Sequence, residues 1–174
     1  MDDLRYPIGK FEAPESYTDE IRQKFIREID EAPARLREAV SGIEGDRWDR
    51  PYRPEGWTVR QVVHHLPDSH LNAYIRFKLG LTEDMPAVKP YDEARWAELA
   101  DVKTVPPAVS LDLLESMHGR LTALLRSMSE ADFQRKVLHS ERGETSLDWL
   151  LALYAWHGRH HVAHITSLRE REGW

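Results

Sequence analysis

The sequence predicts an all-α protein, a four-helix bundle with long crossover loops and an irregular N-terminal arm. Four long segments repeat apolar residues at the three- and four-residue spacing of amphipathic helices. No segment shows a convincing alternation of apolar and polar residues, the pattern typical of a half-buried strand. The chain has 174 residues, of which 41% are hydrophobic, so it can bury a core and is expected to form one domain over residues 1–174.

Local signals define the elements in chain order. We expect an arm over 1–15, long helices over 18–41, 58–81, 110–128 and 145–171, and a short helix near 92–99. The arm is irregular because Pro7, Gly9 and Pro14 interrupt it. Pro33 lies inside the first long helix and should kink or divide it, because proline has no backbone N–H and its ring crowds the preceding turn.

The second long helix has a well-marked beginning. Residues 45–57 are rich in proline and glycine and should form a loop. Thr58 followed by Gln61 is a capping-box pair, in which each side chain accepts a hydrogen bond from the other residue's backbone N–H. Pro67 lies within this helix, and a local distortion is expected there.

Serine and threonine residues mark the beginnings of the last two helices. Ser110 is expected to cap the third helix. The fourth helix should begin after Thr145 or Ser146 and end before Gly173, because glycine readily adopts the left-handed conformation that closes a helix.

Composition and charge exclude several classes of function. The net charge is −6 and no cluster of lysine and arginine resembles a nucleic-acid-binding surface. The longest apolar run has eight residues, whereas a membrane-spanning helix needs about 20. The chain has no cysteine, which excludes disulfides and cysteine–metal sites. The absence of cysteine makes a cytoplasmic location the expectation. The N-terminal segment has no apolar region typical of a signal peptide.

Seven of the nine histidines fall within two predicted helices. They are His64, His65 and His70 in the second helix and His157, His160, His161 and His164 in the fourth. Histidines four residues apart lie on one helix face about 6 Å from each other, close enough to share a metal ion. The fourth helix offers two such pairs, His157/His161 and His160/His164. This clustering indicates a metal site, and buried structural histidines are the alternative.

Positions on the helical wheel distinguish the two pairs. His157 and His161 lie in the middle of the apolar stripe of the fourth helix. His160 and His164 lie toward its edge. On the second helix, His65 also lies at an edge. Because a solvent-accessible metal site between two helices favours edge positions, this reasoning selects His65, His160 and His164.

Other residues are weaker candidates for a functional role. Asp68 could orient a ligand histidine by accepting a hydrogen bond from it, and the alternative is an exposed helical carboxylate. His118 is expected to be a hydrogen-bonded core residue, and His139 is expected in a loop. The sequence has no GxSxG, no phosphate-binding glycine loop and no HExxH, so it does not support a serine hydrolase, a nucleotide-binding protein or a zincin.

Five segments of the chain resemble one known family. They are LRYPIGKFEAPES, PYRPEGWTVRQVVHHLPDSHLNAYIRFKLGLTE, KPYDEARWAEL, HGRLTALLRSM and WHGRHHVAHITSLREREGW. These segments are similar to the DinB-like four-helix-bundle proteins, and among them to the YfiT-type branch of metal-dependent hydrolases, also described as bacillithiol transferases. The resemblance covers nearly the whole chain in order, and GWTVRQVVHHLPDSH is its highly specific segment.

The resemblance implies a metal site. It implies one divalent metal per chain, held by one histidine of the second helix and two of the fourth, with water at open positions. Carried over residue by residue, these ligands are His65, His160 and His164. Zn²⁺ is expected, and Ni²⁺, Fe²⁺ or Mn²⁺ also suit imidazole ligands. The family usually has a small residue where this chain has Pro67, which leaves the local helix geometry open.

Three functions are compatible with such a site. Three imidazoles and an open coordination position are typical of a catalytic metal. In the preferred interpretation, the metal activates a low-molecular-weight thiol such as bacillithiol, which attacks and detoxifies an electrophile. In the first alternative, activated water hydrolyses an amide or ester. The second alternative is a non-catalytic metal- or ligand-binding bundle. The resemblance also implies a homodimer that acts on a small molecule.

Overall fold

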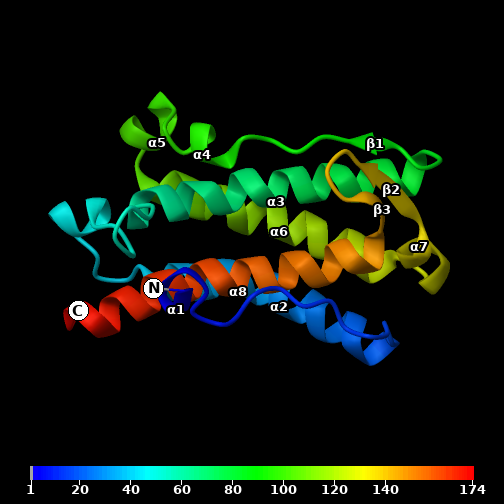
Figure 1. Ribbon diagram of the computed structural model, residues 1–174, viewed down its shortest axis with the longest axis horizontal. Coiled ribbons are helices and arrows are strands. Elements are labelled where there is room, and N and C mark those ends of the chain that lie inside the picture. The colour runs from blue at the N-terminus through cyan, green and yellow to red at the C-terminus, as the bar shows by residue number, and fades with distance from the viewer. Residues whose placement is uncertain (1) are drawn as a thin grey trace.

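The computed structural model describes residues 2–174 and confirms the four-helix bundle (Figure 1). The bundle helices are α2 (Asp19–Ala39), α3 (Val59–Thr82), α6 (Pro107–Ser127) and α8 (Leu147–Glu172). The remaining elements are the helices α1 (Asp2–Arg5), α4 (Glu93–Trp96), α5 (Ala100–Thr104) and α7 (Glu130–Gln134), the 3₁₀-helix η1 (Gly45–Asp49), and the strands β1 (Ala87–Val88), β2 (Lys136–His139) and β3 (Gly143–Ser146).

The order of the helices around the bundle explains the long connections. Helix α2 packs against α6 and α8, and α3 packs against the same two helices. The consecutive helices α2 and α3 therefore lie diagonally across the bundle, as do α6 and α8. Helices α3 and α6 run in one direction, and α2 and α8 run in the other (Figure 1). A tight turn cannot connect diagonal helices, so residues 40–58 and 128–146 form the crossovers.

Side-chain caps set the ends of α3 and α8 as the sequence predicts. The Thr58 hydroxyl accepts from the Gln61 backbone N–H, and the Gln61 side chain accepts from the Thr58 N–H. Ser146 caps α8 through the N–H of Trp149. The helix closes at Gly173, which has a φ of 69°.

Helix α6 begins earlier than predicted. It starts at Pro107, so Ser110 lies inside the helix and does not cap it. Proline is favourable in the first turn because the N–H it lacks would have no partner in the helix. The Ser110 side chain instead contacts His64, with 2.7 Å between the hydroxyl oxygen and Nδ1.

The two prolines inside helices do not divide them. Helix α2 continues through Pro33 and α3 continues through Pro67, and both prolines are buried. Each proline removes a single helical hydrogen bond, and packing against neighbouring helices maintains the backbone on both sides of it. In α2, the carbonyl oxygen that Pro33 leaves without its helical donor is that of Ile29, four residues earlier.

A small sheet at one end of the bundle was not predicted. Strands β1 and β2 pair in parallel, and β2 and β3 form an antiparallel hairpin. His139 therefore lies on β2 and not in a loop. These strands have two to four residues, too few for an alternating pattern to stand out in the sequence.

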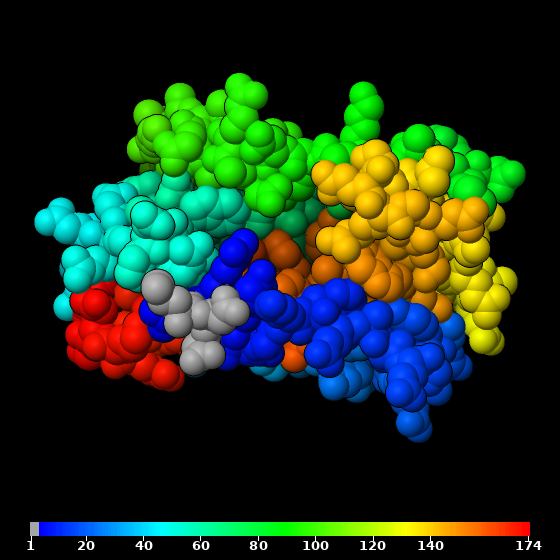
Figure 2. Space-filling view, viewed as in Figure 1, coloured from blue at the N-terminus to red at the C-terminus, as the bar shows by residue number. Residues whose placement is uncertain are grey.

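The N-terminal arm covers part of α8. It includes the short helix α1, which contacts α8. Figure 2 shows the arm, in blue, crossing the front of the molecule, with a recess beside it in which α8, in orange, is visible. Among the described residues, no helix has both the length and the apolar character needed to cross a membrane.

Candidate metal centre

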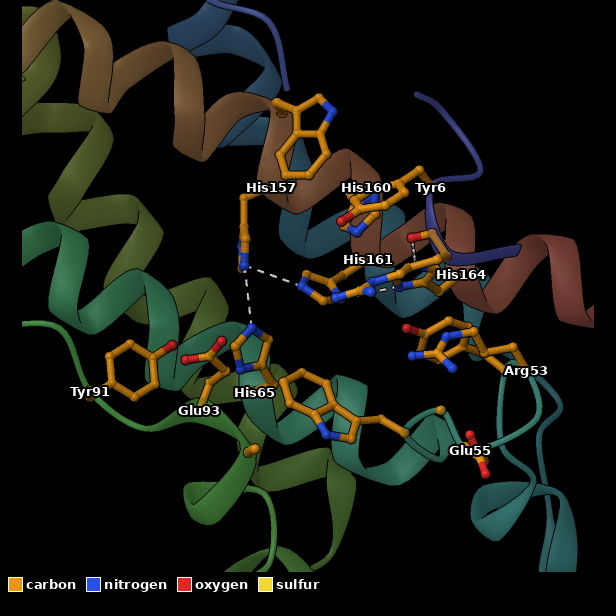
Figure 3. Close-up of a pocket in the computed structure, with 16 residues that line it drawn as sticks. Tyr6, Arg53, Glu55, His65, Tyr91, Glu93, His157, His160, His161 and His164 are labelled. Carbon is orange, nitrogen blue, oxygen red and sulfur yellow. Dashed lines mark hydrogen bonds between the residues drawn. The ribbon is translucent and has the colours of Figure 1, made fainter. Parts of the chain in front are cut away.

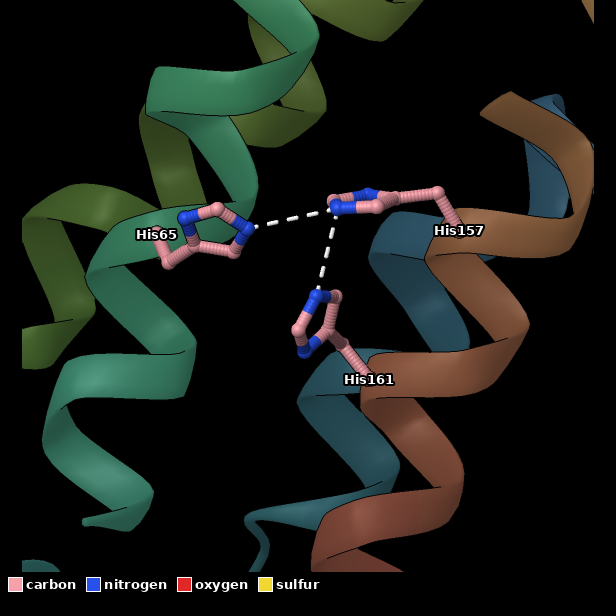
Figure 4. A group of neighbouring side chains, drawn as sticks. All are labelled: His65, His157 and His161. Carbon is pink, nitrogen blue, oxygen red and sulfur yellow. Dashed lines mark hydrogen bonds between the residues drawn. The ribbon is translucent and has the colours of Figure 1, made fainter. Parts of the chain in front are cut away.

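Three histidines from two helices point their ring nitrogens at one another (Figure 4). His65 comes from the first third of α3, and His157 and His161 come from successive turns of α8. The Nε2 atom of His157 lies 3.2 Å from Nε2 of His65 and 3.2 Å from Nε2 of His161. One ligand atom from each residue lies within 4.8 Å of the other two. The structure thus brings together one pair from α8 and one histidine from α3.

The spacing of these atoms suits a metal ion. Nitrogen atoms bound at 2.0–2.1 Å to a tetrahedral zinc lie roughly 3.3–3.4 Å from each other. The two distances of 3.2 Å at His157 are close to this value. The three residues supply imidazole alone, which suits zinc, nickel, copper and iron better than calcium or magnesium.

Burial keeps these rings neutral, as metal binding requires. It lowers the pKa of His65 to about 3, with a further contribution from the neighbouring histidines. Burial and neighbouring histidines also hold the pKa of His157 and of His161 well below the usual value. At pH 7 each ring therefore has a lone pair available for a cation without first losing a proton.

The cluster lines a cavity of about 460 Å³ (Figure 3). Aromatic rings form much of its wall; they belong to Tyr6, Tyr52, Trp57, Tyr91 and Trp156. Arg5 and Arg53 contribute positive charge, and Glu55 and Glu93 contribute carboxylates. Trp57 also contacts His65, with ring centroids 4.6 Å apart. A cavity of this size and composition accommodates a small organic molecule next to the three imidazoles.

Two of the histidines selected from the sequence line the cavity outside this cluster. His160 stacks on Trp156 and on Tyr6, with ring centroids 4.3 and 5.8 Å apart. His164 stacks on Tyr52 at 3.8 Å, and its Nε2 lies 3.0 Å from the carbonyl oxygen of Arg5. The edge of the α8 stripe thus faces the arm and the loop before α3.

The middle of the α8 stripe faces the interior, where α3 brings His65. His157 and His161 occupy this part of the stripe, and the sequence shows them as one of its two pairs with helical spacing. The expectation, drawn from the sequence, that a metal site lies at the edge of the stripe selects the pair His160/His164 instead. The cavity reaches the bundle interior, so a central position is both buried and adjacent to the cavity.

The other sequence candidates have different surroundings. In residues 2–174, no hydrogen bond joins the Asp68 carboxylate to an imidazole, and burial together with Asp101 raises its pKa to about 6. His118 is buried and hydrogen-bonded, as expected, with Nδ1 2.6 Å from the carbonyl oxygen of Ile29. His70 is fully buried and contacts both His118 and His157. Its proximity to the cluster was not evident from the sequence.

Comparison with known proteins places the chain in a family. Residues 28–165, most of the chain, match the model of the DinB superfamily. The chain belongs to the DinB superfamily. Over all 174 residues it is 54% identical to "Putative metal-dependent hydrolase BcerKBAB4_2443" of Bacillus mycoides, and the match covers all of both chains. It is also 52% identical to "Putative metal-dependent hydrolase YfiT" of Bacillus subtilis, over 98% of this chain and 97% of that protein.

Solved structures of relatives agree with this DinB superfamily fold. The solved structure of Bacillus subtilis YfiT, described as a probable metal-dependent hydrolase with an unusual four-helix bundle topology, superposes with a TM-score of 0.96 at 51% identity and 99% coverage of both chains. A mycothiol-dependent maleylpyruvate isomerase superposes with a TM-score of 0.66 at 18% identity, over 83% of this chain and 60% of that one. At this low sequence identity, the similarity to the isomerase shows only that the two proteins share a fold.

Acid should weaken the metal-free DinB bundle. Burial lowers the pKa of His118 to about 4, although its hydrogen bond to Ile29 and the charge of Asp30 act in the opposite direction. The folded state therefore keeps this ring neutral, while the unfolded chain binds a proton near the ordinary value of 6.5. The contribution of His118 to the free energy of unfolding is therefore complete above pH 6.5 and is lost as the pH falls toward 4. The difference between a pKa of 6.5 in the unfolded chain and about 4 in the folded protein corresponds to about 3 kcal/mol of the free energy of unfolding.

Urea unfolding of metal-free protein between pH 7.5 and 4.5 measures this dependence. The His118→Phe variant should lose stability less steeply than the wild type over this range, because it lacks the group whose pKa differs between the two states. If the free energy of unfolding falls with pH equally steeply in the two proteins, His118 does not contribute to the acid sensitivity.

Proposed function

We propose that this protein is a metal-dependent enzyme in which His65, His157 and His161 hold one divalent cation, with Zn²⁺ as the expected ion. The convergence of three neutral imidazoles at the wall of a cavity carries this proposal. The Bacillus relatives, named as metal-dependent hydrolases, support it. With three protein ligands, a bound metal keeps a position for an exogenous nucleophile, whose pKa it lowers.

The chain's own residues bind and orient the reactants. The three imidazoles are held on two rigid helices, so they need little rearrangement to bind a cation. The aromatic wall excludes water from the apolar part of a substrate. Because the cluster contributes no negative charge, the cation would keep its full positive charge and attract an anionic nucleophile such as a thiolate.

An acidic low-molecular-weight thiol is the first candidate for the nucleophile. Arg53 lines the cavity, and its Nη1 donates to the carbonyl oxygen of Pro54 at 2.8 Å. Its Nε is buried and has no hydrogen-bond partner among the side chains that the structure describes, those of residues 4–174. The Arg53 guanidinium contributes positive charge at the cavity, which favours a ligand that carries a carboxylate. We therefore propose thiol S-transfer to a small electrophile, as bacillithiol transfer would require.

Hydrolysis of an amide or ester is the second candidate. It is favoured by the names of the full-length relatives and by Glu93, a carboxylate on α4 that lines the same cavity (Figure 3). A general base must reach the attacking water directly or through another water. Incubating the metal-loaded protein with an ester in the absence of thiol, and with an electrophile in its presence, separates the two reactions. Acceleration of neither reaction would favour the non-catalytic alternative.

Metal content tests the ligand set. Untagged wild-type protein should contain about one divalent metal per chain by inductively coupled plasma mass spectrometry. The His65→Ala, His157→Ala and His161→Ala variants should lose it, because two imidazoles hold a divalent cation much more weakly than three. His160→Ala is the matched control: it removes an imidazole from the same helix and cavity and should retain the metal.

The opposite pattern would support the set selected from the sequence. If His160→Ala and His164→Ala lose the metal while His157→Ala and His161→Ala retain it, the ligands are His65, His160 and His164. A wild-type protein that binds no divalent metal after reconstitution would overturn both sets.

A further inference from the structure

A chain of hydrogen-bonded imidazoles runs through the bundle to His157. The carbonyl oxygen of Ile29 on α2 lies 2.6 Å from Nδ1 of His118 on α6. Nε2 of His118 lies 2.9 Å from Nδ1 of His70 on α3. Nε2 of His70 lies 3.2 Å from Nδ1 of His157 on α8. This relay, which we call the inner relay, takes one residue from each of the four bundle helices and ends at the ring whose Nε2 faces the cluster.

The carbonyl at its beginning determines where every proton lies. A carbonyl oxygen only accepts, so Nδ1 of His118 carries the hydrogen. A neutral ring has one N–H and one lone pair, so Nε2 of His118 accepts from Nδ1 of His70. By the same reasoning, Nε2 of His70 accepts from Nδ1 of His157. The Nε2 atom of His157 is then left with a lone pair and no hydrogen.

Pro33 explains why this carbonyl is available. In an uninterrupted helix, the oxygen of Ile29 would accept from the N–H of residue 33, and proline has none. The oxygen is directed instead to His118. The proline in the middle of α2 thus frees the acceptor on which the inner relay depends.

A second, shorter relay ends at His161. The carbonyl oxygen of Arg5 at the end of α1 lies 3.0 Å from Nε2 of His164. Nδ1 of His164 lies 3.4 Å from Nδ1 of His161, a long hydrogen bond. The carbonyl accepts a hydrogen bond from Nε2–H of His164, so Nδ1 of His164 has a lone pair. His161 therefore donates from Nδ1 and keeps a lone pair on Nε2. This outer relay connects the N-terminal arm to the cluster.

The two relays leave two lone pairs facing each other. Nε2 of His157 and Nε2 of His161 are 3.2 Å apart, and neither has a hydrogen to donate to the other. Two lone pairs at this distance repel unless a cation lies between them. Building on the metal site proposed above, we infer that His118, His70 and His164 are positioning residues, which fix the tautomers of His157 and His161 so that both present Nε2 to a metal before it binds.

The carbonyl ends also exclude a different role. A relay that carried protons to solvent would have to end at a group that can accept and release a proton. At the side away from the cluster, both relays begin at backbone carbonyls, which cannot do this. They therefore hold the rings in one tautomer and do not conduct protons away from the site.

Nuclear magnetic resonance of metal-free, ¹⁵N-histidine-labelled protein at pH 8 tests the inference directly. Two-bond ¹H–¹⁵N correlations identify the nitrogen that carries the hydrogen in each ring. We expect the Nδ1–H tautomer for His118, His70, His157 and His161, and the Nε2–H tautomer for His164. Free histidine in water prefers Nε2–H, so the first four assignments are diagnostic. An Nε2–H tautomer at His157 or His161 would overturn the inference.

A variant separates the two relays. In His118→Phe, His70 loses its acceptor, and His70 and His157 should shift toward the Nε2–H tautomer while His161 and His164 keep theirs. Zinc affinity, measured by competition with a chromogenic chelator, should fall by about 10- to 100-fold with the stoichiometry unchanged. His139→Phe, which replaces a buried histidine on β2 outside both relays, should leave both readouts unchanged.

These measurements distinguish failure of the relay from failure of the metal site. If the wild type binds no metal but shows the expected tautomers, the proposed function fails and the hydrogen-bond assignment stands. If the wild type binds zinc and His118→Phe binds it with equal affinity and unchanged tautomers at His70 and His157, the relay has no positioning role. A poorly folded His118→Phe would leave the wild-type tautomers as the decisive test.

Discussion

Zinc added to the metal-free protein will stabilise the fold strongly. A cation that binds only the native state adds about 4 kcal/mol to the free energy of unfolding when its free concentration is 1,000 times its dissociation constant. For a chain of this length, that corresponds to a rise of roughly 8–16 °C in Tm. The native state supplies three neutral imidazoles on two helices, and unfolding separates His65 from the other two.

Thermal unfolding with and without zinc measures this effect in wild type and variants. His157→Ala should lose most of the stabilisation, because it removes the ring that lies 3.2 Å from both partners. His160→Ala should keep it. An equal rise in Tm for the two variants would show that zinc stabilises the protein from somewhere else.

Asp148→Ala is expected to be among the most destabilising single substitutions. The Asp148 carboxylate accepts from Nε and Nη2 of Arg22 at 2.8 and 2.9 Å, and both side chains are almost fully buried. Removing the carboxylate leaves a buried guanidinium whose other ion-pair partner is the exposed Asp19. Losing one partner of a buried ion pair costs about 3–5 kcal/mol of the free energy of unfolding.

Urea unfolding near pH 7.5 measures this cost, with two comparisons. Arg37→Ala removes ion pairs to Asp112 and Glu115 on the exposed surface and should cost at most about 1 kcal/mol. The double variant Arg22→Met/Asp148→Leu should recover much of the loss, because it removes the unpaired charge and leaves apolar side chains in its place. A loss below about 1 kcal/mol in Asp148→Ala would mean that water or Asp19 compensates the guanidinium.

The sequence predicts the helices well because their signals are local. The capping box at Thr58 and the glycine at 173 depend only on neighbours three or four residues away. The same reasoning failed at Ser110, where Pro107 provides an alternative beginning for α6. At Pro33 the helix is not divided, because tertiary packing maintains a helix that a proline would weaken in isolation. The homodimer and the cytoplasmic location stay predictions.

The sequence by itself determined that histidines cluster on two helices, that His65 is a candidate ligand, and that α8 offers two pairs with helical spacing. The choice between those pairs depends on how far α8 is rotated toward α3. That rotation is set by packing among all four helices and by the arm that covers one face of α8. The tertiary structure alone decided that His157 and His161 face His65, that His118 and His70 reach His157 through hydrogen bonds between different helices, and that the carbonyl oxygen of Arg5 meets His164 from the distant N-terminal arm.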